Sequence, residues 1–199
     1  MDTPRYINPL TDFGFKRIFG DEEIMRDFLN DAMAPDTHIV ELSFIDKEMM
    51  PETKYERGII YDMRCKLDNG EEVIVEMQNR GQDYFSERIV YYLSRAIVMQ
   101  GEKGDGWKYN LHNVYGVFFM NFFLDDKSPR DIRHVALIDT DTQQLFTKTF
   151  QFWLMELPRF RTMTEADCKT NIDYWLYILT HSETIRTNIP FQSQKPIFH

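Results

Sequence analysis

The chain has 199 residues, of which 43% are hydrophobic and 15% aromatic, so it is long and apolar enough to bury a substantial core. This composition excludes a disordered chain, and the longest apolar runs are too short and too interrupted to span a bilayer. The formal net charge of −9 excludes a protein that is basic throughout, so binding to nucleic acid would need a locally basic surface. The two cysteines, Cys65 and Cys168, match no zinc or disulfide spacing and suit a reducing cytoplasm.

The first predicted elements are two short helices, each preceded by a residue that suits the N-cap position. Thr11 precedes a helix over residues 12–19, and Asp21 precedes a second helix over 22–33. Gly20, between them, is suited to end the first helix. Alternating apolar and polar residues then predict three strands, over residues 38–48, 59–67 and 71–78.

Helical periodicity returns after the third strand. Apolar residues from Phe85 to Ala96 recur at helical spacing, which predicts a helix within residues 84–100 with Asp83 as its N-cap. Further strands and a closing helix are predicted over residues 113–124, 133–139, 146–158 and 165–185. The first of these strands is apolar throughout, as is typical of a central strand buried on both faces, whereas the last strand alternates. This order predicts a mixed α/β fold around one sheet.

The second and third predicted strands each carry an acid in their interior, where carboxylates usually weaken a sheet. Their apolar faces coincide only if odd-numbered residues pair with odd-numbered residues. A three-residue loop over 68–70, with Gly70 in the left-handed conformation, meets this condition. The resulting register predicts that Asp62 lies directly opposite Glu76, with Cβ atoms about 4.5–5.5 Å apart.

Two carboxylates at this distance repel each other, so they need either a shared proton or a cation between them. A hard divalent ion such as Mg²⁺ takes oxygen ligands and is often held by one or two carboxylates. Gln78 lies on the same face as Glu76, two residues further on. The alternative is a solvated charged face, in which Arg64 and Lys66 are the partners and a diagonal pair from Arg64 neutralises Asp62 without metal.

The order Asp, hairpin, Glu-x-Gln in YDMRCKLDNGEEVIVEMQ resembles the PD-(D/E)xK nuclease superfamily, in which these acids hold the metal and a Lys follows. Four further segments are similar to the Rpn-type recombination-promoting nucleases, a transposase family: NPLTDFGFKRIFG, FSERIVYYLSRAIVMQ, NVYGVFFMNFFL and FWLMELPRF. The resemblance runs over almost the whole chain. It implies a restriction-endonuclease-like αβββαβ core, with a mixed central sheet flanked by helices, plus extra strands and a C-terminal helix. It also implies that residues 1–199 form a single nuclease-like domain, truncated at its C-terminus because members of the family are commonly longer.

The resemblance further implies that Asp62 and Glu76 ligate Mg²⁺, with Mn²⁺ as a substitute. Gln78 stands where the superfamily has Lys and cannot carry its positive charge, so its expected role is to orient a water. An early helix often adds an acid. Asp12 is preferred here because it lies in the matching motif, and Lys16 could then approach a phosphate.

Alternatives remain open for these residues. Glu22 and Glu23 are the other candidates for the early acid, and Glu56, a strand-length before Asp62, is a weaker alternative ligand. Asp12 and Lys16 could also be ordinary surface residues of a helix.

Arg88 and Tyr92 are four residues apart and share a face of the predicted helix. In the resembling fold they would border the metal site, and Arg88 would contact the scissile phosphate. In the structural alternative, Tyr92 packs in the core and Arg88 pairs with Glu87 or Asp83.

Together these features predict a metal-dependent DNA endonuclease that serves recombination or mobile elements. A catalytically weak or inactive nuclease-fold module that binds DNA or protein is one alternative. A defence or toxin-like nuclease is another. A homodimer is expected if both strands of a duplex are cut, because two sites make this easiest.

Overall fold

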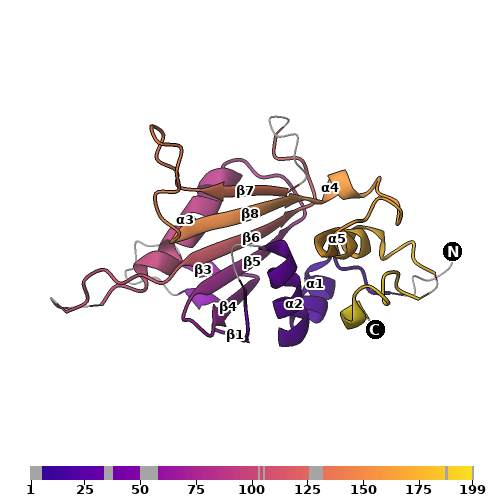
Figure 1. Cartoon of the computed structure of the whole chain (residues 1–199), viewed down its shortest axis with the longest axis horizontal. Coiled ribbons are helices and arrows are strands. Elements are labelled where there is room, and N and C mark those ends of the chain that lie inside the picture. Colours follow the sequence, from indigo (N-terminus) through magenta and orange to yellow (C-terminus); the bar gives the residue numbers. More distant parts are fainter. Residues whose placement is uncertain are drawn as a thin grey trace.

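The computed structural model describes residues 6–33, 38–49, 58–102, 104, 106–125, 132–186 and 188–198. The α-helices are α1 (Asp12–Phe19), α2 (Glu22–Ala32), α3 (Phe85–Val98), α4 (Leu157–Phe160) and α5 (Asn171–His181). The strands are β1 (Leu42–Phe44), β2 (Glu48–Met49), β3 (Ile59–Ile60), β4 (Met63–Leu67), β5 (Glu72–Gln78), β6 (Val114–Met120), β7 (Ile132–Ala136) and β8 (Phe150–Glu156). A mixed central sheet lies between helices (Figure 1), which confirms the predicted α/β class and its restriction-endonuclease-like core.

The central sheet has six strands in the order β1-β4-β5-β6-β8-β7. β1, β4 and β5 form antiparallel pairs, β5, β6 and β8 are parallel, and β7 returns antiparallel at the edge. The register places Gln78, Met120 and Glu156 in one row, so the three parallel strands end together. We call this end of the sheet the carboxyl edge, because it is where open parallel sheets commonly bind ligands.

Two of the predicted strands are broken. The strand predicted over 38–48 is instead β1 and β2, and the strand predicted over 59–67 is β3 and β4. β2 and β3 pair with each other in a separate two-stranded sheet, so the chain leaves the central sheet between β1 and β4. This excursion is a long-range pairing that local alternation does not reveal.

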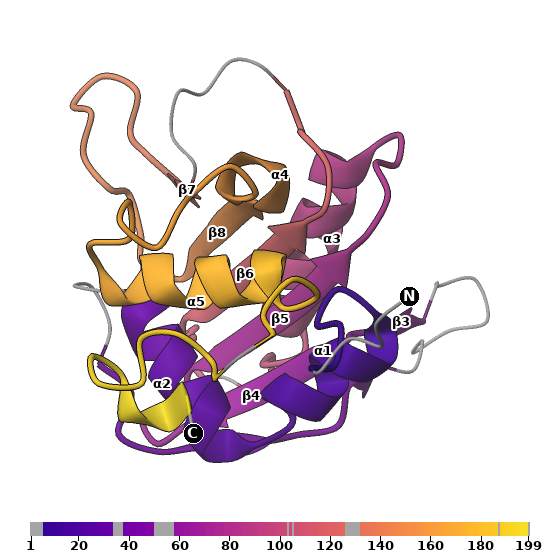
Figure 2. The same ribbon diagram turned by 90° about the vertical axis from the view of Figure 1, so that its right-hand side faces the viewer.

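Each face of the central sheet carries its own core. Val73 and Val75 face a core built with α1, α2 and α5, whereas Ile74 faces a second core beneath α3. Figure 2 shows α3 on the opposite side of the strands from α2 and α5. β6 is buried along its whole length, as predicted. β8 is buried from Gln151 onward rather than alternating, because it lies inside the sheet between β6 and β7.

The helix termini agree with the predictions in part. Thr11 and Asp21 cap α1 and α2 through their side chains, as predicted. Asp83 is not the N-cap of α3: Tyr84 precedes the helix in a left-handed conformation, with φ 62°, and makes no side-chain cap. The closing helix begins only at Asn171, because the segment before it forms turns and its N-cap carries a capping box.

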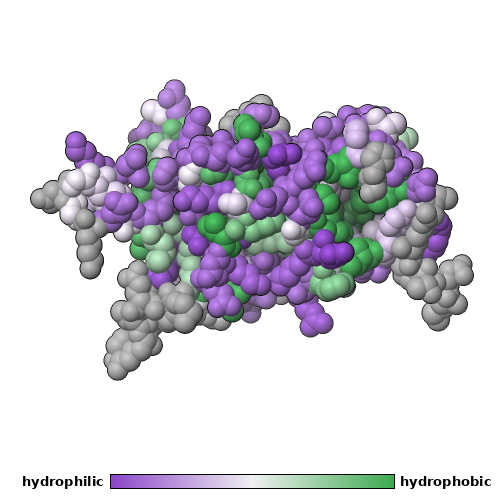
Figure 3. Space-filling view, turned by 90° about the horizontal axis from the view of Figure 1, so that it is seen from below, coloured by the Kyte–Doolittle hydropathy of each residue, from purple (hydrophilic) through white to green (hydrophobic). Residues whose placement is uncertain are grey.

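An apolar pocket of about 270 Å³ opens between α1, α5 and the C-terminal segment, with Ile18, Trp175 and Phe198 in its lining. Figure 3 shows apolar surface gathered toward this end of the molecule. The pocket lies on the α1 and α5 side of the sheet, away from the face beneath α3. Across the described ranges, no helix combines the length and apolar character that a membrane crossing needs.

Candidate active site

The hairpin between β4 and β5 has the register predicted from parity. The N–H of Leu67 donates to the carbonyl oxygen of Glu71 at 2.8 Å, so residues 68–70 form a three-residue loop. Gly70 has φ +85°, a left-handed conformation that favours glycine. The predicted turn is therefore confirmed, and the register continued beyond β4 brings the two predicted acids opposite each other.

The prediction that Asp62 lies in a strand interior is wrong. Asp62 lies in a bend one residue before β4 begins. Its N–H donates to Oε1 of Glu76 at 2.9 Å, and the N–H of Met77 donates to Oδ2 of Asp62 at 2.8 Å. Each carboxylate thus accepts a backbone N–H from the other side of the hairpin. This exchange explains how the sheet tolerates two acids here, and it holds both carboxylates side by side.

The bend also ties the hairpin to α3. Tyr61 is fully buried in the core beneath α3, whereas Met63, two residues further on, belongs to the other core. The hydroxyl of Tyr61 donates to the carbonyl oxygen of Tyr92 at 2.9 Å, and the two rings meet edge to face. Tyr92 therefore packs in the core, as one alternative predicted, and its ring also lies against the guanidinium of Arg88.

Glu76 is the most buried of the predicted site residues, with a side chain 3% exposed. Burial raises the pKa of its carboxyl from 4.5 to about 7, and the negative charge of Asp62 adds to the increase. The hydrogen bond from the backbone of Asp62, the charge of Arg88 and the amide of Gln78 oppose it. The amide Nε2 of Gln78 donates to Oε2 of Glu76 at 3.3 Å.

Arg88 reaches from α3 toward the acids. Its Nη2 lies 3.5 Å from Oε2 of Glu76, and its Nη1 donates to Oε1 of Gln82 at 2.7 Å and of Gln78 at 3.3 Å. The guanidinium stacks 4.9 Å from the ring centroid of Tyr92. The described contacts of Arg88 are thus with the site residues, and the alternative pairing with Glu87 or Asp83 is not observed.

Arg64 does not neutralise Asp62. Its Nη2 lies 2.7 Å from Oε2 of Glu72, and both side chains are largely buried. A further hydrogen bond joins Arg64 to the carbonyl oxygen of Asp46. Lys66 is exposed. The solvated-face alternative therefore does not describe these acids, because the nearest arginine on the hairpin is committed elsewhere.

α1 lies beside the carboxyl end of β5. Asn79, which follows β5, donates to the carbonyl oxygen of Leu10 at 2.7 Å and so holds the start of α1 there. Asp12 is 71% exposed and forms an ion pair with Lys16 at 2.5 Å. The hydrogen bond with Asp12 raises the pKa of Lys16, and the charges of both hairpin acids act in the same direction. Lys16 is therefore within electrostatic reach of these acids.

The other candidates for an early acid lie apart from the hairpin acids. Glu22 and Glu23 begin α2 and line a separate hollow with Arg26 and Glu41. Glu56 lies outside the described residues.

A hollow of about 630 Å³ opens beside Arg88. It is lined by Gly58, Ile59, Gln82, Asp83, Tyr84, Glu87, Arg88, Tyr91 and Tyr92. Arg88 thus stands between this hollow and the acids, where an incoming anion could reach its guanidinium.

Sequence reasoning missed Gln82, the closest partner of Arg88, because it lies in an irregular segment without periodicity.

The donor set suits a hard divalent ion. Asp62 and Glu76 supply two carboxylates, and Mg²⁺ usually takes one or two together with waters and substrate phosphates. In the parts of the chain that the structure describes, no cluster of three or more His, Cys, Asp or Glu side chains is placed to hold a metal. A structural zinc site, which needs four such ligands, does not fit these residues.

The raised pKa of Glu76 predicts that the metal-free protein loses stability as pH rises from about 5 to 8. Folding favours the protonated carboxyl, so the stabilisation is complete below the ordinary pKa and disappears as pH passes about 7. A shift of this size corresponds to about 3 kcal/mol. Urea unfolding in a chelator at pH 5 and pH 8 measures it, with Glu76→Gln as the control that removes the titration. An equal pH dependence in the two proteins would contradict the prediction.

The mixed sheet with its hairpin acids and flanking α3 is the architecture of a PD-(D/E)XK nuclease. A family model described as PD-(D/E)XK nuclease family transposase matches residues 9–199. The chain therefore belongs to this family, whose description places it among nuclease-type proteins of mobile elements. Searches of curated proteins and of solved structures give no match.

Proposed function

We propose that the protein is a Mg²⁺-dependent DNA endonuclease, with Mn²⁺ as a substitute ion, that serves recombination or mobile elements. The observation that carries this proposal is the exchange of hydrogen bonds that holds Asp62 and Glu76 side by side. Burial and mutual repulsion leave Glu76 short of compensating positive charge, which a divalent ion would supply. Membership of a nuclease family supports DNA as the substrate.

Asp62 and Glu76 would hold the ion, which when bound supplies Lewis acidity and lowers the pKa of a water. Gln78 is placed to orient the attacking water, because its amide already contacts Oε2 of Glu76. It cannot stabilise developing negative charge as a Lys would. That task falls to Arg88, whose guanidinium lies 3.5 Å from Glu76, and to Lys16, whose pKa is raised by Asp12 and by the charges of both acids.

Arg88 has two tasks in this proposal. At 3.5 Å its contact with Glu76 is longer than a good charge-assisted hydrogen bond, whereas its contact with Gln82 is 2.7 Å. Arg88 therefore offsets part of the negative charge of Glu76 without occupying the space between the acids. It also binds the scissile phosphate from the side of the hollow. Tyr92 holds the guanidinium by stacking, and Asp12 holds Lys16.

The test is plasmid nicking by purified protein in Mg²⁺, beside Asp62→Ala and Glu76→Ala. We expect nicking by the wild type and none above background by either variant. Asp68→Ala is the matched control, because it removes an exposed carboxylate from the loop of the same hairpin. Nicking that survives both site substitutions would remove the assignment, since a contaminating nuclease would then be its source.

A nuclease-fold binding module without turnover is the second candidate, and Gln78 in place of the superfamily Lys favours it. Calorimetric Mg²⁺ binding that depends on Glu76, without cleavage of any DNA, would support this candidate over the first.

A further inference from the structure

The carboxyl edge continues beyond the acids. Gln78, Met120 and Glu156 lie in one row across β5, β6 and β8, so their side chains point to the same face. Neighbouring strands are about 4.8 Å apart, which puts Glu156 roughly 10 Å from Gln78. One strand of a DNA duplex rises about 3.4 Å per nucleotide, so this span corresponds to about three nucleotides.

Polar side chains that are exposed or half-buried follow the ends of these strands. Arg161 donates to Oδ1 of Asn121, Nδ2 of Asn121 donates to Oδ1 of Asn79 at 3.3 Å, and Asn79 donates to the carbonyl oxygen of Leu10. This chain of hydrogen bonds links the residues after α4, β6 and β5 to the start of α1. We call Asn79, Arg80, Asn121, Arg159 and Arg161 the carboxyl rim.

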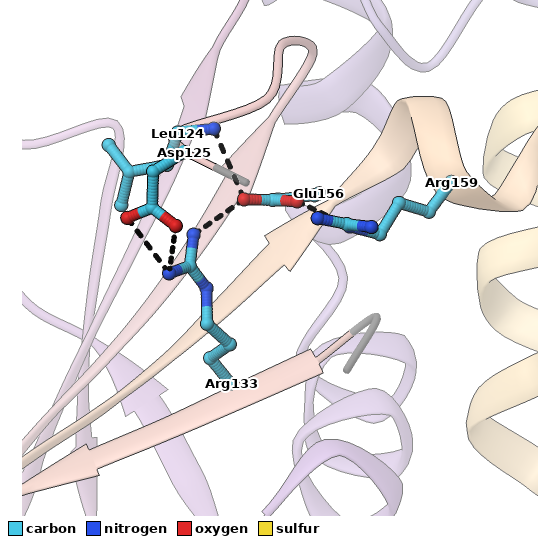
Figure 4. A network of polar contacts seen from close by, with 5 residues as sticks. All are labelled: Leu124, Asp125, Arg133, Glu156 and Arg159. Carbon is cyan, nitrogen blue, oxygen red and sulfur yellow. Dashed lines mark hydrogen bonds and ion pairs between the residues drawn. The ribbon is translucent and has the colours of Figure 1, made fainter. Parts of the chain in front are cut away.

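A buried carboxylate anchors one end of the rim. Glu156 is fully buried and accepts hydrogen bonds from Arg133 and Arg159 at 2.5 Å each, and from the N–H of Leu124 at 3.1 Å (Figure 4). Arg133 also binds both oxygens of Asp125. Because α4 begins directly after Glu156, this network holds the chain that carries the rim arginines against the end of β8.

Among the described residues of the rim and its anchor, Glu156 and Asp125 carry two negative charges and Arg133 and Arg159 two positive charges. The exposed Arg80 and Arg161 add positive charge to this set. This is the locally basic surface that an acidic chain would need in order to hold phosphates. A guanidinium has five N–H donors, so Arg161 can bind Asn121 and a phosphate oxygen together.

We propose that the carboxyl rim, through Arg161 above all, binds the phosphate backbone of DNA beside the phosphate at Asp62 and Glu76, within the span of about three nucleotides between the ends of β5 and β8. This inference rests on the proposed endonuclease function. Arg161 is then a substrate-positioning residue that sets the path of the strand across the sheet edge. It makes no base contact, so its effect is independent of DNA sequence.

The test measures binding of a fluorescent duplex by fluorescence anisotropy over a range of salt concentrations, in a Glu76→Gln background that prevents cleavage. Arg161→Ala should weaken binding about tenfold. It should also lower the slope of log affinity against log salt by about 1. Arg161→Lys should retain most of that slope, because the charge remains. Lys148→Ala is the matched control, since it removes an exposed cation at the opposite end of β8.

Equal affinity and slope for Arg161→Ala and Lys148→Ala would overturn the inference, and wild-type nicking would then still support the endonuclease. A protein that binds no duplex at low salt would overturn both. Thermal unfolding of each variant shows that a loss of binding is not a loss of folding, and Arg161→Lys keeps the test valid if the alanine variant unfolds.

Discussion

Glu76→Gln is expected to lower the rate of plasmid nicking about 10³-fold while the protein stays folded. The amide keeps the size of the side chain and can still accept the N–H of Asp62, but it lacks the charge that holds a divalent ion. Metal ions contribute several kcal/mol to such reactions, and about 4 kcal/mol corresponds to this factor. Single-turnover nicking rates and calorimetric titration with Mg²⁺ measure the two effects together.

Asp68→Asn is the matched control, because it makes the same chemical change on an exposed residue of the same hairpin. It should leave both readouts unchanged. A Glu76→Gln protein that nicks within tenfold of the wild type would show that the buried carboxylate is not a metal ligand.

Glu156→Ala is expected to lower the free energy of unfolding by about 3–5 kcal/mol. The substitution leaves Arg133 and Arg159 facing a buried space without their shared carboxylate, and it deprives the N–H of Leu124 of its acceptor. The cost arises because several buried or partly buried groups lose a shared acceptor at once, although Arg133 keeps its ion pair with Asp125. Urea unfolding monitored by tryptophan fluorescence measures it.

Two comparisons make this second prediction specific. Glu165→Ala removes an exposed carboxylate and should change stability by less than about 0.5 kcal/mol. Adding Arg133→Met to Glu156→Ala should recover part of the loss, because it removes a largely buried cation that has lost one of its two carboxylate partners. A Glu156→Ala protein as stable as the Glu165 variant would mean that the arginines find solvent and that the network does not hold α4.

Local signals were sufficient for elements whose termini are set by neighbouring residues. Thr11 and Asp21 cap their helices because a short oxygen-bearing side chain reaches the first free N–H groups of its own chain. Asp83 fails at the same task because Tyr84 takes a left-handed conformation and turns the chain before α3 begins. Helical periodicity does not reveal this turn.

The sequence by itself determined the hairpin register and therefore which acids face each other. Side chains alternate with a period of two, and only a three-residue loop with Gly70 in the left-handed position puts the apolar residues of both strands on one face. Only the tertiary structure decided what those acids touch. The bend at Asp62, the choice of Glu72 as the partner of Arg64 and the approach of Arg88 depend on contacts between different elements, which the pattern along one strand does not reveal. The same holds for Glu156, whose partners come from β7 and α4, because a buried charge is recognised by its surroundings and not by its neighbours in sequence.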